Sequence, residues 1–182
     1  RGVAPDASLY IAKVLDAAGN GRMTSVMAGV EWAVDEGVQV ISLSLGGSGP
    51  CDGTDALSEM CDAAVAEGVV VCVAAGNEGP EPYTVGAPGC ARDVITIGAA
   101  SDLDRIATFS SRGPTRDGRL KPDVVLPGVE IVAARAQGTR MGTVVDEHYT
   151  AASGTSMATP HAAGICALLL QAEPGLTPEE VK

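Results

Sequence analysis

The stretch VVVCVAA, residues 69–75, decides the fold, because it is apolar almost throughout. Such a run is typical of a parallel strand that is covered on both faces. A helical pattern precedes it at residues 55–67, and a second strand, VQVISLSL, precedes that helix at residues 38–45. A helix at residues 24–36 and a strand at residues 94–99 extend the alternation. The sequence therefore predicts an α/β domain with a mostly parallel sheet and crossover helices.

The flanking segments are less regular. Residues 9–15 are apolar enough to form another strand, and residues 156–172 form a helix rich in Ala and Leu. Between residues 101 and 149 the pattern loosens into loops and short extended pieces that prolines interrupt. Thr177 starts a last helix, since a proline follows it and Glu180 stands three residues on. The sequence contains no repeat or linker, so we expect a single domain. We also expect that this domain is incomplete, because the sequence stops within the helix that Thr177 starts.

Composition narrows the range of functions. The 182 residues include 23 acidic and 12 basic side chains, which gives a net charge of -11. A surface this acidic repels phosphate backbones, so nucleic-acid binding is disfavoured. Hydrophobic residues make up 46% of the chain, which excludes a disordered tail. No run reaches the ~18 apolar residues of a membrane span, so no membrane partner is expected.

The chain has 5 cysteines, an odd number that cannot pair completely within one molecule. Cys72 and Cys166 stand in apolar runs and are expected to behave as small hydrophobic residues. Cys51 and Cys61 lie in a polar stretch and are able to form a bridge, which the sequence does not decide. No Cys-x-x-Cys pair and no compact calcium-loop spacing occur, so no metal site is predicted.

One turn places a serine where a nucleophile is useful. In SGTSMATPH, residues 153–161, small residues deliver the hydroxyl of Ser156 to the start of a long apolar helix. Free backbone N–H groups and the positive end of the helix dipole favour a developing negative charge there. The tetrahedral intermediate of acyl transfer carries such a charge. The alternative interpretation is that this serine only caps the helix.

A second turn, after the strand at residues 69–75, places the side-chain amide of Asn77 at the edge of the sheet. Asn77 follows the central strand directly, at the carboxyl end of the sheet, where parallel α/β folds bind ligands. Its side-chain N–H is able to donate to an oxyanion. The alternative interpretation is a turn asparagine with positive φ.

Together the two turns resemble the subtilisin-like serine proteases, or subtilases. GTSMATPHAAG (154–164) matches the nucleophile motif of that family, and VAAGNEG (73–79) matches its oxyanion motif. Further segments are similar to the family in the family's order: residues 1–21, 29–47 and 109–131. The resemblance implies a three-layer subtilisin-like fold. It also implies that residues 1–182 are a partial peptidase domain without its N-terminal strands and last helices.

The resemblance implies roles for single residues. Ser156 would be the nucleophile, Asn77 the side-chain donor of the oxyanion hole, and a peptide or protein the substrate. The residues themselves leave the side-chain preference undecided, since small pocket walls permit a large apolar side chain and Glu78 near the rim favours a basic one. No cofactor is implied for this chain, although full-length relatives can bind calcium. One edge of the implied cleft pairs with the peptide backbone and consists of Ser44, Leu45 and Gly46. The opposite rim contains Gly19 and Gly21. The walls of the specificity pocket are Ala74, Ala75, Gly76 and Gly86.

Two motifs of the family do not occur. Subtilases take the triad Asp and His from motifs that precede the point matching Arg1, and this sequence has only 2 His. His161 lies ~140° around the helix from Ser156 and matches a structural His of the family. His148 lies in a loop-like stretch to which the family gives no base role. Removing the base lowers turnover by ~10⁶ in this class of enzyme, so we expect these residues alone to be nearly inactive.

The same comparison bears on assembly and on rival functions. In relatives, the strand of the triad Asp lies between those matching residues 9–15 and 38–45, so these two either pair directly or leave open edges. Open edges invite a second chain, and we expect a rearranged monomer or a homodimer. The alternatives to a peptidase are a catalytically silent peptide-binding module and another acyl hydrolase, such as an esterase. The family favours secretion and the cysteines allow a cytoplasmic location, so the compartment is undecided.

Overall fold

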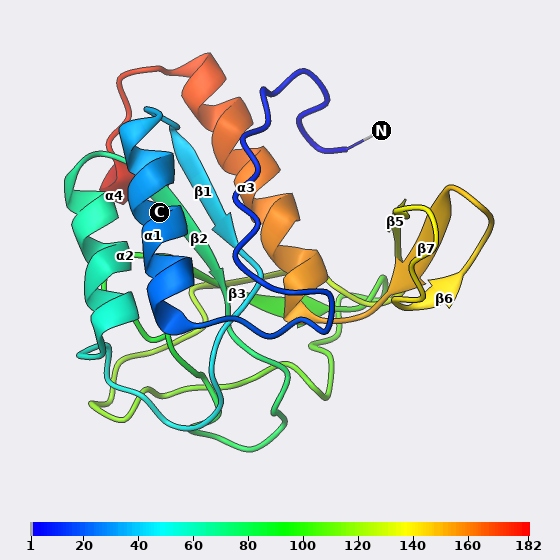
Figure 1. The fold of residues 1–182 in the computed structure, drawn as a ribbon. Coiled ribbons are helices and arrows are strands. Elements are labelled where there is room, and N and C mark those ends of the chain that lie inside the picture. Colours follow the sequence, from blue (N-terminus) through cyan, green and yellow to red (C-terminus); the bar gives the residue numbers. More distant parts are fainter. Residues whose placement is uncertain (1) are drawn as a thin grey trace.

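The computed structural model describes residues 2–182 and has three layers (Figure 1). Helices α1 (Met23–Asp35) and α2 (Ala56–Ala66) cover one face of the central sheet, and α3 (Thr155–Ala172) covers the other. A short helix, α4 (Pro178–Val181), follows α3 and starts at Thr177 with the predicted capping box. The four parallel strands lie in the order β1 (Val40–Leu43), β2 (Val70–Ala74), β3 (Ile95–Ala100) and β4 (Val124–Pro127). The predicted three-layer α/β fold with a mostly parallel sheet is confirmed.

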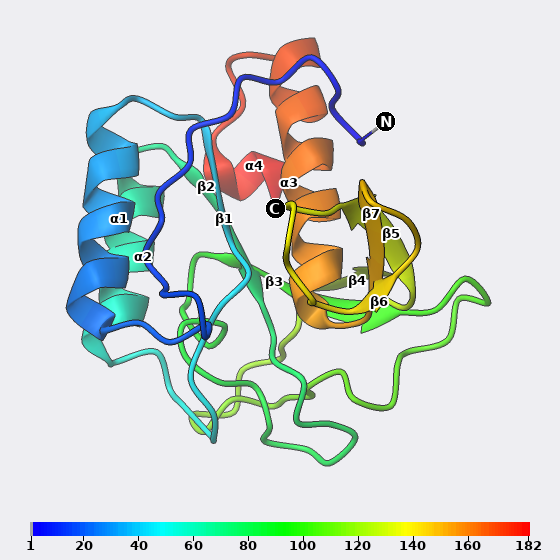
Figure 2. The same cartoon turned by 45° about the vertical axis from the view of Figure 1, so that its right-hand side comes forward.

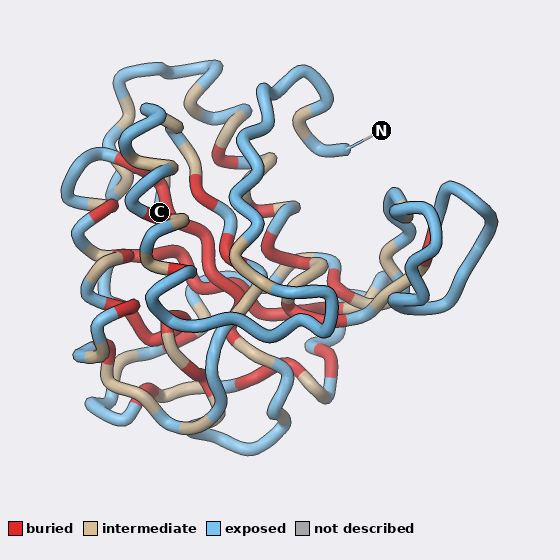
Figure 3. The backbone as a smooth tube through the Cα atoms, in the orientation of Figure 1, coloured by how far each residue is buried: buried red, intermediate tan, exposed pale blue. Residues whose placement is uncertain are grey.

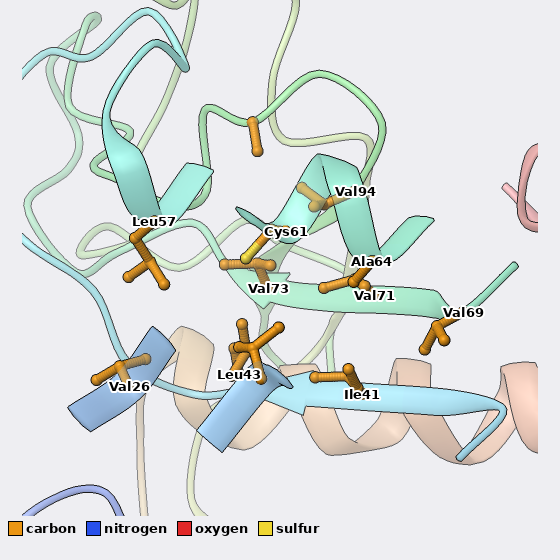
Figure 4. Close-up of a cluster of buried hydrophobic side chains, with 12 residues drawn as sticks. Val26, Ile41, Leu43, Leu57, Cys61, Ala64, Val69, Val71, Val73 and Val94 are labelled. Atoms are coloured by element: carbon orange, nitrogen blue, oxygen red, sulfur yellow. The ribbon is translucent and has the colours of Figure 1, made fainter. Parts of the chain in front are cut away.

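Strand β2 accounts for the apolar run that predicted the sheet. All its residues are buried, and successive side chains point to opposite faces. Val71 and Val73 pack in the cluster under α1 and α2 (Figure 4), whereas Val70 and Cys72 pack in the cluster under α3. Because both faces are covered, neither set of positions can carry a polar side chain at low cost.

A second, smaller sheet stands beside the start of α3 (Figures 1 and 2). It is antiparallel, in the order β5 (Ile131–Ala134), β7 (Tyr149–Ala152) and β6 (Thr143–Val144). Its connection to the helix is fixed where the N–H of Gly154 donates to the carbonyl of Gly128 at 2.8 Å. This sheet falls in the stretch for which only short extended pieces were predicted.

The strand predicted at residues 9–15 is wrong. The segment is extended but takes no part in either sheet, and Leu9 and Ile11 are 81% and 77% exposed. Figure 3 shows it running along the surface while buried residues follow the central strands. A strand needs a hydrogen-bonding neighbour, and within the described residues β1 pairs only with β2. Of the two expected arrangements, direct pairing is therefore excluded, and the outer edge of β1 is open.

The sequence left a bridge between Cys51 and Cys61 undecided, and the structure has a different one. Cys51 is bonded to Cys90, over a separation of 39 residues. Cys61 is a free, buried thiol that points from α2 into the core (Figure 4). Cys72 and Cys166 are buried as predicted, with their sulfur atoms 3.8 Å apart between β2 and α3.

Among residues 2–182, no helix is both long and apolar enough to cross a membrane. In the same range, no cluster of three or more His, Cys, Asp or Glu side chains is arranged to hold a metal ion.

Candidate active site

Ser156 lies at the second position of α3, where it is half-buried. The cap of this helix is Gly154, and no side chain caps it. The Ser156 hydroxyl instead donates to the backbone carbonyl of Ser44, at 3.2 Å. The interpretation of Ser156 as a helix cap is therefore wrong, and its hydroxyl is directed toward the chain that follows β1.

A second hydrogen bond runs in the opposite direction between the same two residues. The hydroxyl of Ser44 donates to the backbone carbonyl of Ser156, at 2.9 Å. The two serines, 112 positions apart, thus hold the end of β1 against the start of α3. Ser44 was predicted to belong to the substrate cleft, and it lies against the predicted nucleophile.

Asn77 is exposed at the end of β2, and its side chain is oriented by one neighbour. Its Oδ1 accepts hydrogen bonds from the backbone N–H of Thr155, at 2.8 Å, and from the Thr155 hydroxyl, at 3.1 Å. With Oδ1 held in this way, Nδ2 is the end of the amide left to donate, and it has no acceptor among the described residues. Asn77 does not have positive φ; the glycine before it does, with φ of 109°. The interpretation of Asn77 as a left-handed turn residue is wrong.

A first cavity, of about 440 Å³, opens beside Ser156. It is formed by residues 74–78 at the end of β2, by the 45–48 loop that follows β1, and by the 84–87 loop. Asn77 and Ser156 both line it. The predicted pocket and edge residues in its lining are Leu45, Gly46, Ala74, Ala75, Gly76 and Gly86.

Two predicted residues lie elsewhere. Gly19 and Gly21, expected as the opposite rim, line neither this cavity nor the second one described below. Gly19 belongs to an exposed turn whose backbone is held by the carboxylate of Asp16. The structure therefore brings together the serine, the amide, the edge and the pocket, but not this rim.

A second cavity, of about 640 Å³, lies on the other side of Ser156, between α3 and the smaller sheet. Asn77 and Ser156 line it as well, so these two residues stand where the cavities meet. Glu130, Val132 and Met141 contribute its far side. Sequence reasoning missed this cavity, because the short exposed strands that form it have no strong pattern.

Neither histidine contacts Ser156. The ring of His161 bonds through Nδ1 to the carbonyl of Met157, at 2.8 Å, one turn back along α3. His148 is exposed and pairs with Glu147, at 2.9 Å. The described residues therefore include the predicted nucleophile and the predicted oxyanion donor, and neither histidine is at hydrogen-bond distance from Ser156.

Fold and site together have the arrangement of a serine hydrolase: a serine at a helix start and an oriented amide beside a cleft at the carboxyl ends of parallel strands. Comparisons with known proteins agree. The model of the subtilase family matches residues 1–182. The chain belongs to this family of subtilisin-like serine proteases.

Similar proteins include bacterial proteases. The serine protease AprX of Bacillus subtilis (strain 168) is 43% identical, over 100% of this chain and 46% of its own length. Subtilisin E of the same organism is 42% identical, over 100% of this chain and 43% of its own. Among solved structures, a cold-adapted subtilisin-like serine proteinase superposes with a TM-score of 0.73 at 32% identity, covering 93% of this chain and 55% of that one. The chain thus spans less than half the length of these two curated relatives.

Proposed function

We propose that the protein to which this chain belongs is a serine endopeptidase that works through an acyl-enzyme. The hydroxyl of Ser156 attacks the peptide carbonyl, and its proton passes to a histidine that we assign outside residues 1–182. The backbone N–H of Ser156 and Nδ2 of Asn77 then stabilise the oxyanion. The observation that carries this proposal is the Thr155–Asn77 contact, which leaves the donor end of the amide at the cleft beside Ser156. We assign the reaction no cofactor.

The substrate is proposed to lie across both cavities. Its backbone would pair with Ser44, Leu45 and Gly46 as an added strand. The side chain before the cleaved bond would enter the first cavity, and the leaving part of the peptide would lie toward the second. This placement is supported by the position of Ser156 at the junction of the two cavities.

Replacing the nucleophile tests the proposal in the full-length protein. We expect Ser156→Ala to abolish peptide hydrolysis and labelling by a phosphonate probe, while Ser25→Ala keeps both. Ser25 is exposed on α1 and lines neither cavity. Full peptide turnover by Ser156→Ala would overturn the assignment.

The isolated chain of 182 residues is proposed to be nearly inactive. Loss of the base costs ~10⁶ in turnover, or about 8 kcal/mol of barrier. The support is that His148 and His161 are both engaged elsewhere. A phosphonate probe should leave Ser156 of the isolated chain unlabelled; rapid labelling would contradict the proposal.

A catalytically silent peptide-binding module is the second candidate function, since both cavities are formed beside Ser156 and no histidine among the described residues bonds to it. It requires the full-length protein to bind peptides with no turnover. An esterase is the third, and it requires ester cleavage with no amide cleavage. Comparing amide and ester substrates on the full-length protein separates the three.

Assembly and location complete the proposal. We propose that the isolated chain dimerises through the open outer edge of β1, which light scattering tests: a mass of one chain would exclude it. We also propose an extracytoplasmic location, because the Cys51–Cys90 disulfide suits an oxidising compartment. Mass spectrometry of protein from its native source should find these two cysteines linked.

A further inference from the structure

We infer that the Cys51–Cys90 disulfide and Arg119 determine side-chain selectivity, by fixing the position of the 45–48 loop relative to the 84–87 loop in the first cavity. None of the three residues lines this cavity, so they act through the loops, as positioning residues. The inference rests on the proposed function, because the side chain that enters the cavity is that of a peptide substrate.

The two loops touch through their backbones. The N–H of Gly47 donates to the carbonyl of Ala87, at 2.8 Å. A Cβ at Gly86 would fall 1.9 Å from the carbonyl oxygen of Gly47, so only glycine permits this approach. A Cβ at Gly46 would lie 2.8 Å from the carbonyl oxygen of Ala87. Because glycines make this contact, the position of each loop depends on the other. The 84–87 loop is also anchored by Val85, which is buried in a cluster with Ala75 and Cys90.

The disulfide joins the chain just beyond both loops. Cys51 stands three residues after the 45–48 loop, and Cys90 stands three residues after the 84–87 loop. Their Cα atoms are 5.9 Å apart, and Cys90 is completely buried. The bond therefore limits how far the two loops can separate.

Arg119 makes a second connection between the same segments. One of its nitrogens, Nη2, donates to the carbonyl of Asp52, at 2.9 Å, and to the carbonyl of Cys90, at 2.8 Å. The carboxylate of Asp117 accepts from Nε, at 2.8 Å, and so fixes the plane of the guanidinium. The disulfide and the guanidinium thus connect the two chain segments at adjacent positions, outside the cavity.

The consequence is a cavity of fixed width. A pocket distinguishes side chains that differ by one methylene by ~10–200-fold, and only where its walls stay in place. When the two loops separate, a large side chain loses contacts on one side, while a small one loses little. The disulfide and Arg119 should therefore affect the choice between substrates more than the chemical step.

The first test uses the full-length protein and two peptide amides that differ only in the side chain before the cleaved bond, Ala or Phe. In Cys51→Ser/Cys90→Ser we expect the ratio of their kcat/KM values to move toward one by about tenfold. The change should come from KM of the Phe peptide, with kcat of the Ala peptide retained. A merely structural role would instead lower kcat for both peptides alike.

Two further variants make the test specific. Cys166→Ala removes a free buried cysteine of α3, which packs in a different hydrophobic cluster from Cys51 and Cys90, and it should keep the wild-type ratio. Arg119→Lys keeps the disulfide and the charge, but one ammonium group cannot make all the hydrogen bonds of the guanidinium. The ratio of kcat/KM values should therefore shift in the same direction, by a smaller factor. This variant also decides the question if the double cysteine variant does not fold. An unchanged ratio in the folded variants would overturn the inference.

Hydrogen exchange of the full-length protein gives a readout that needs no activity. In the double cysteine variant, exchange should become faster in residues 45–53 and 84–91, while β2 and β3 keep wild-type protection. If the protein cleaves no peptide but shows this pattern, the proposed function fails and the positioning role stands. Exchange that is unchanged, or faster throughout, overturns the positioning role whatever the activity.

Discussion

Thr155 is the residue on which the geometry of the site depends. It lies between the cap of α3 and Ser156, and it is completely buried. Its hydroxyl also accepts a hydrogen bond from the N–H of Gly76, at 3.2 Å. One side chain thus connects the end of β2, the amide of Asn77 and the start of the helix that carries the serine. In physical terms, Asn77 is oriented before any substrate is bound, which is what electrostatic stabilisation of an oxyanion requires.

Removing the amide donor should reduce the rate without reducing binding. In the full-length protein we expect Asn77→Leu to lower kcat by ~10²–10³ with little change in KM, because the oxyanion forms only in the transition state. Thr155→Ser is the matched control, since it keeps both groups that bind Oδ1 and should retain most of kcat. Steady-state kinetics on one peptide amide measures both, and wild-type kcat in Asn77→Leu would remove Asn77 from the mechanism.

Burial should also determine which thiols react. Burial, with smaller contributions from the charges of Asp62 and Asp55, raises the pKa of the Cys61 thiol to about 12. Iodoacetamide should therefore leave Cys61 unmodified in the native chain near neutral pH, because almost no thiolate is present. In denaturant the three free cysteines, Cys61, Cys72 and Cys166, should all be labelled. Peptide mass spectrometry counts the adducts; rapid native labelling of Cys61 would contradict this.

At the scale of elements, the start of α2 offers a clean test of local stability. The carboxylate of Asp55 accepts hydrogen bonds from the N–H of Ser58, at 3.0 Å, and from its hydroxyl, at 2.6 Å. We expect Asp55→Ala to lower the free energy of unfolding by about 1 kcal/mol, the usual cost of losing a helix cap. Urea unfolding of the isolated chain measures this change. Glu31→Ala, on the exposed face of α1, should stay within ~0.5 kcal/mol, and equal losses in both would refute the capping role.

The elements that could be predicted are the strands that are buried on both faces and the helices that turn one apolar face toward the sheet, because burial gives their sequences a regular hydrophobic pattern. Strand β2 and helices α1, α2 and α3 were found within a few residues of their true ends. The strand at residues 9–15 was not, because the same apolar residues form a strand only where a neighbour offers hydrogen bonds. Strand β4 and the smaller sheet were missed because their strands are short and mostly exposed, so no alternation reveals them.

The candidate site divides in a similar way. Ser156 and Asn77 could be picked out because turns at the ends of regular elements are visible in the sequence. The partner of Cys51 could not, since 39 residues separate it from Cys90 and nothing local specifies the pairing. The second cavity depends on how the smaller sheet packs beside α3, which is a tertiary property.

At the scale of the whole molecule, the response of stability to pH should carry the contribution of one buried lysine. Burial lowers the pKa of Lys121 from 10.5 to about 8, although its ion pair with Asp123 opposes the shift. Between these two values the unfolded chain binds more protons than the folded one, so the free energy of unfolding rises with pH, by at most ~1.4 kcal/mol per pH unit.

Replacing this lysine should remove that contribution. In Lys121→Met, Asp123 keeps Lys182 at 3.5 Å, and the buried amine is gone. Urea unfolding across this pH window should show wild type gaining stability relative to the variant as pH rises. Parallel curves for the two proteins would show that Lys121 does not titrate there.

The contact between Asn77 and Thr155 joins positions that are 78 residues apart in the chain. A nascent polypeptide that has emerged only as far as β2 therefore carries the Asn77 amide without the side chain that orients it. Thr155 and Ser156 follow together, on the helix that covers the other face of the sheet. Under the proposed function, a ribosome-bound chain that ends before α3 would hydrolyse no peptide bond.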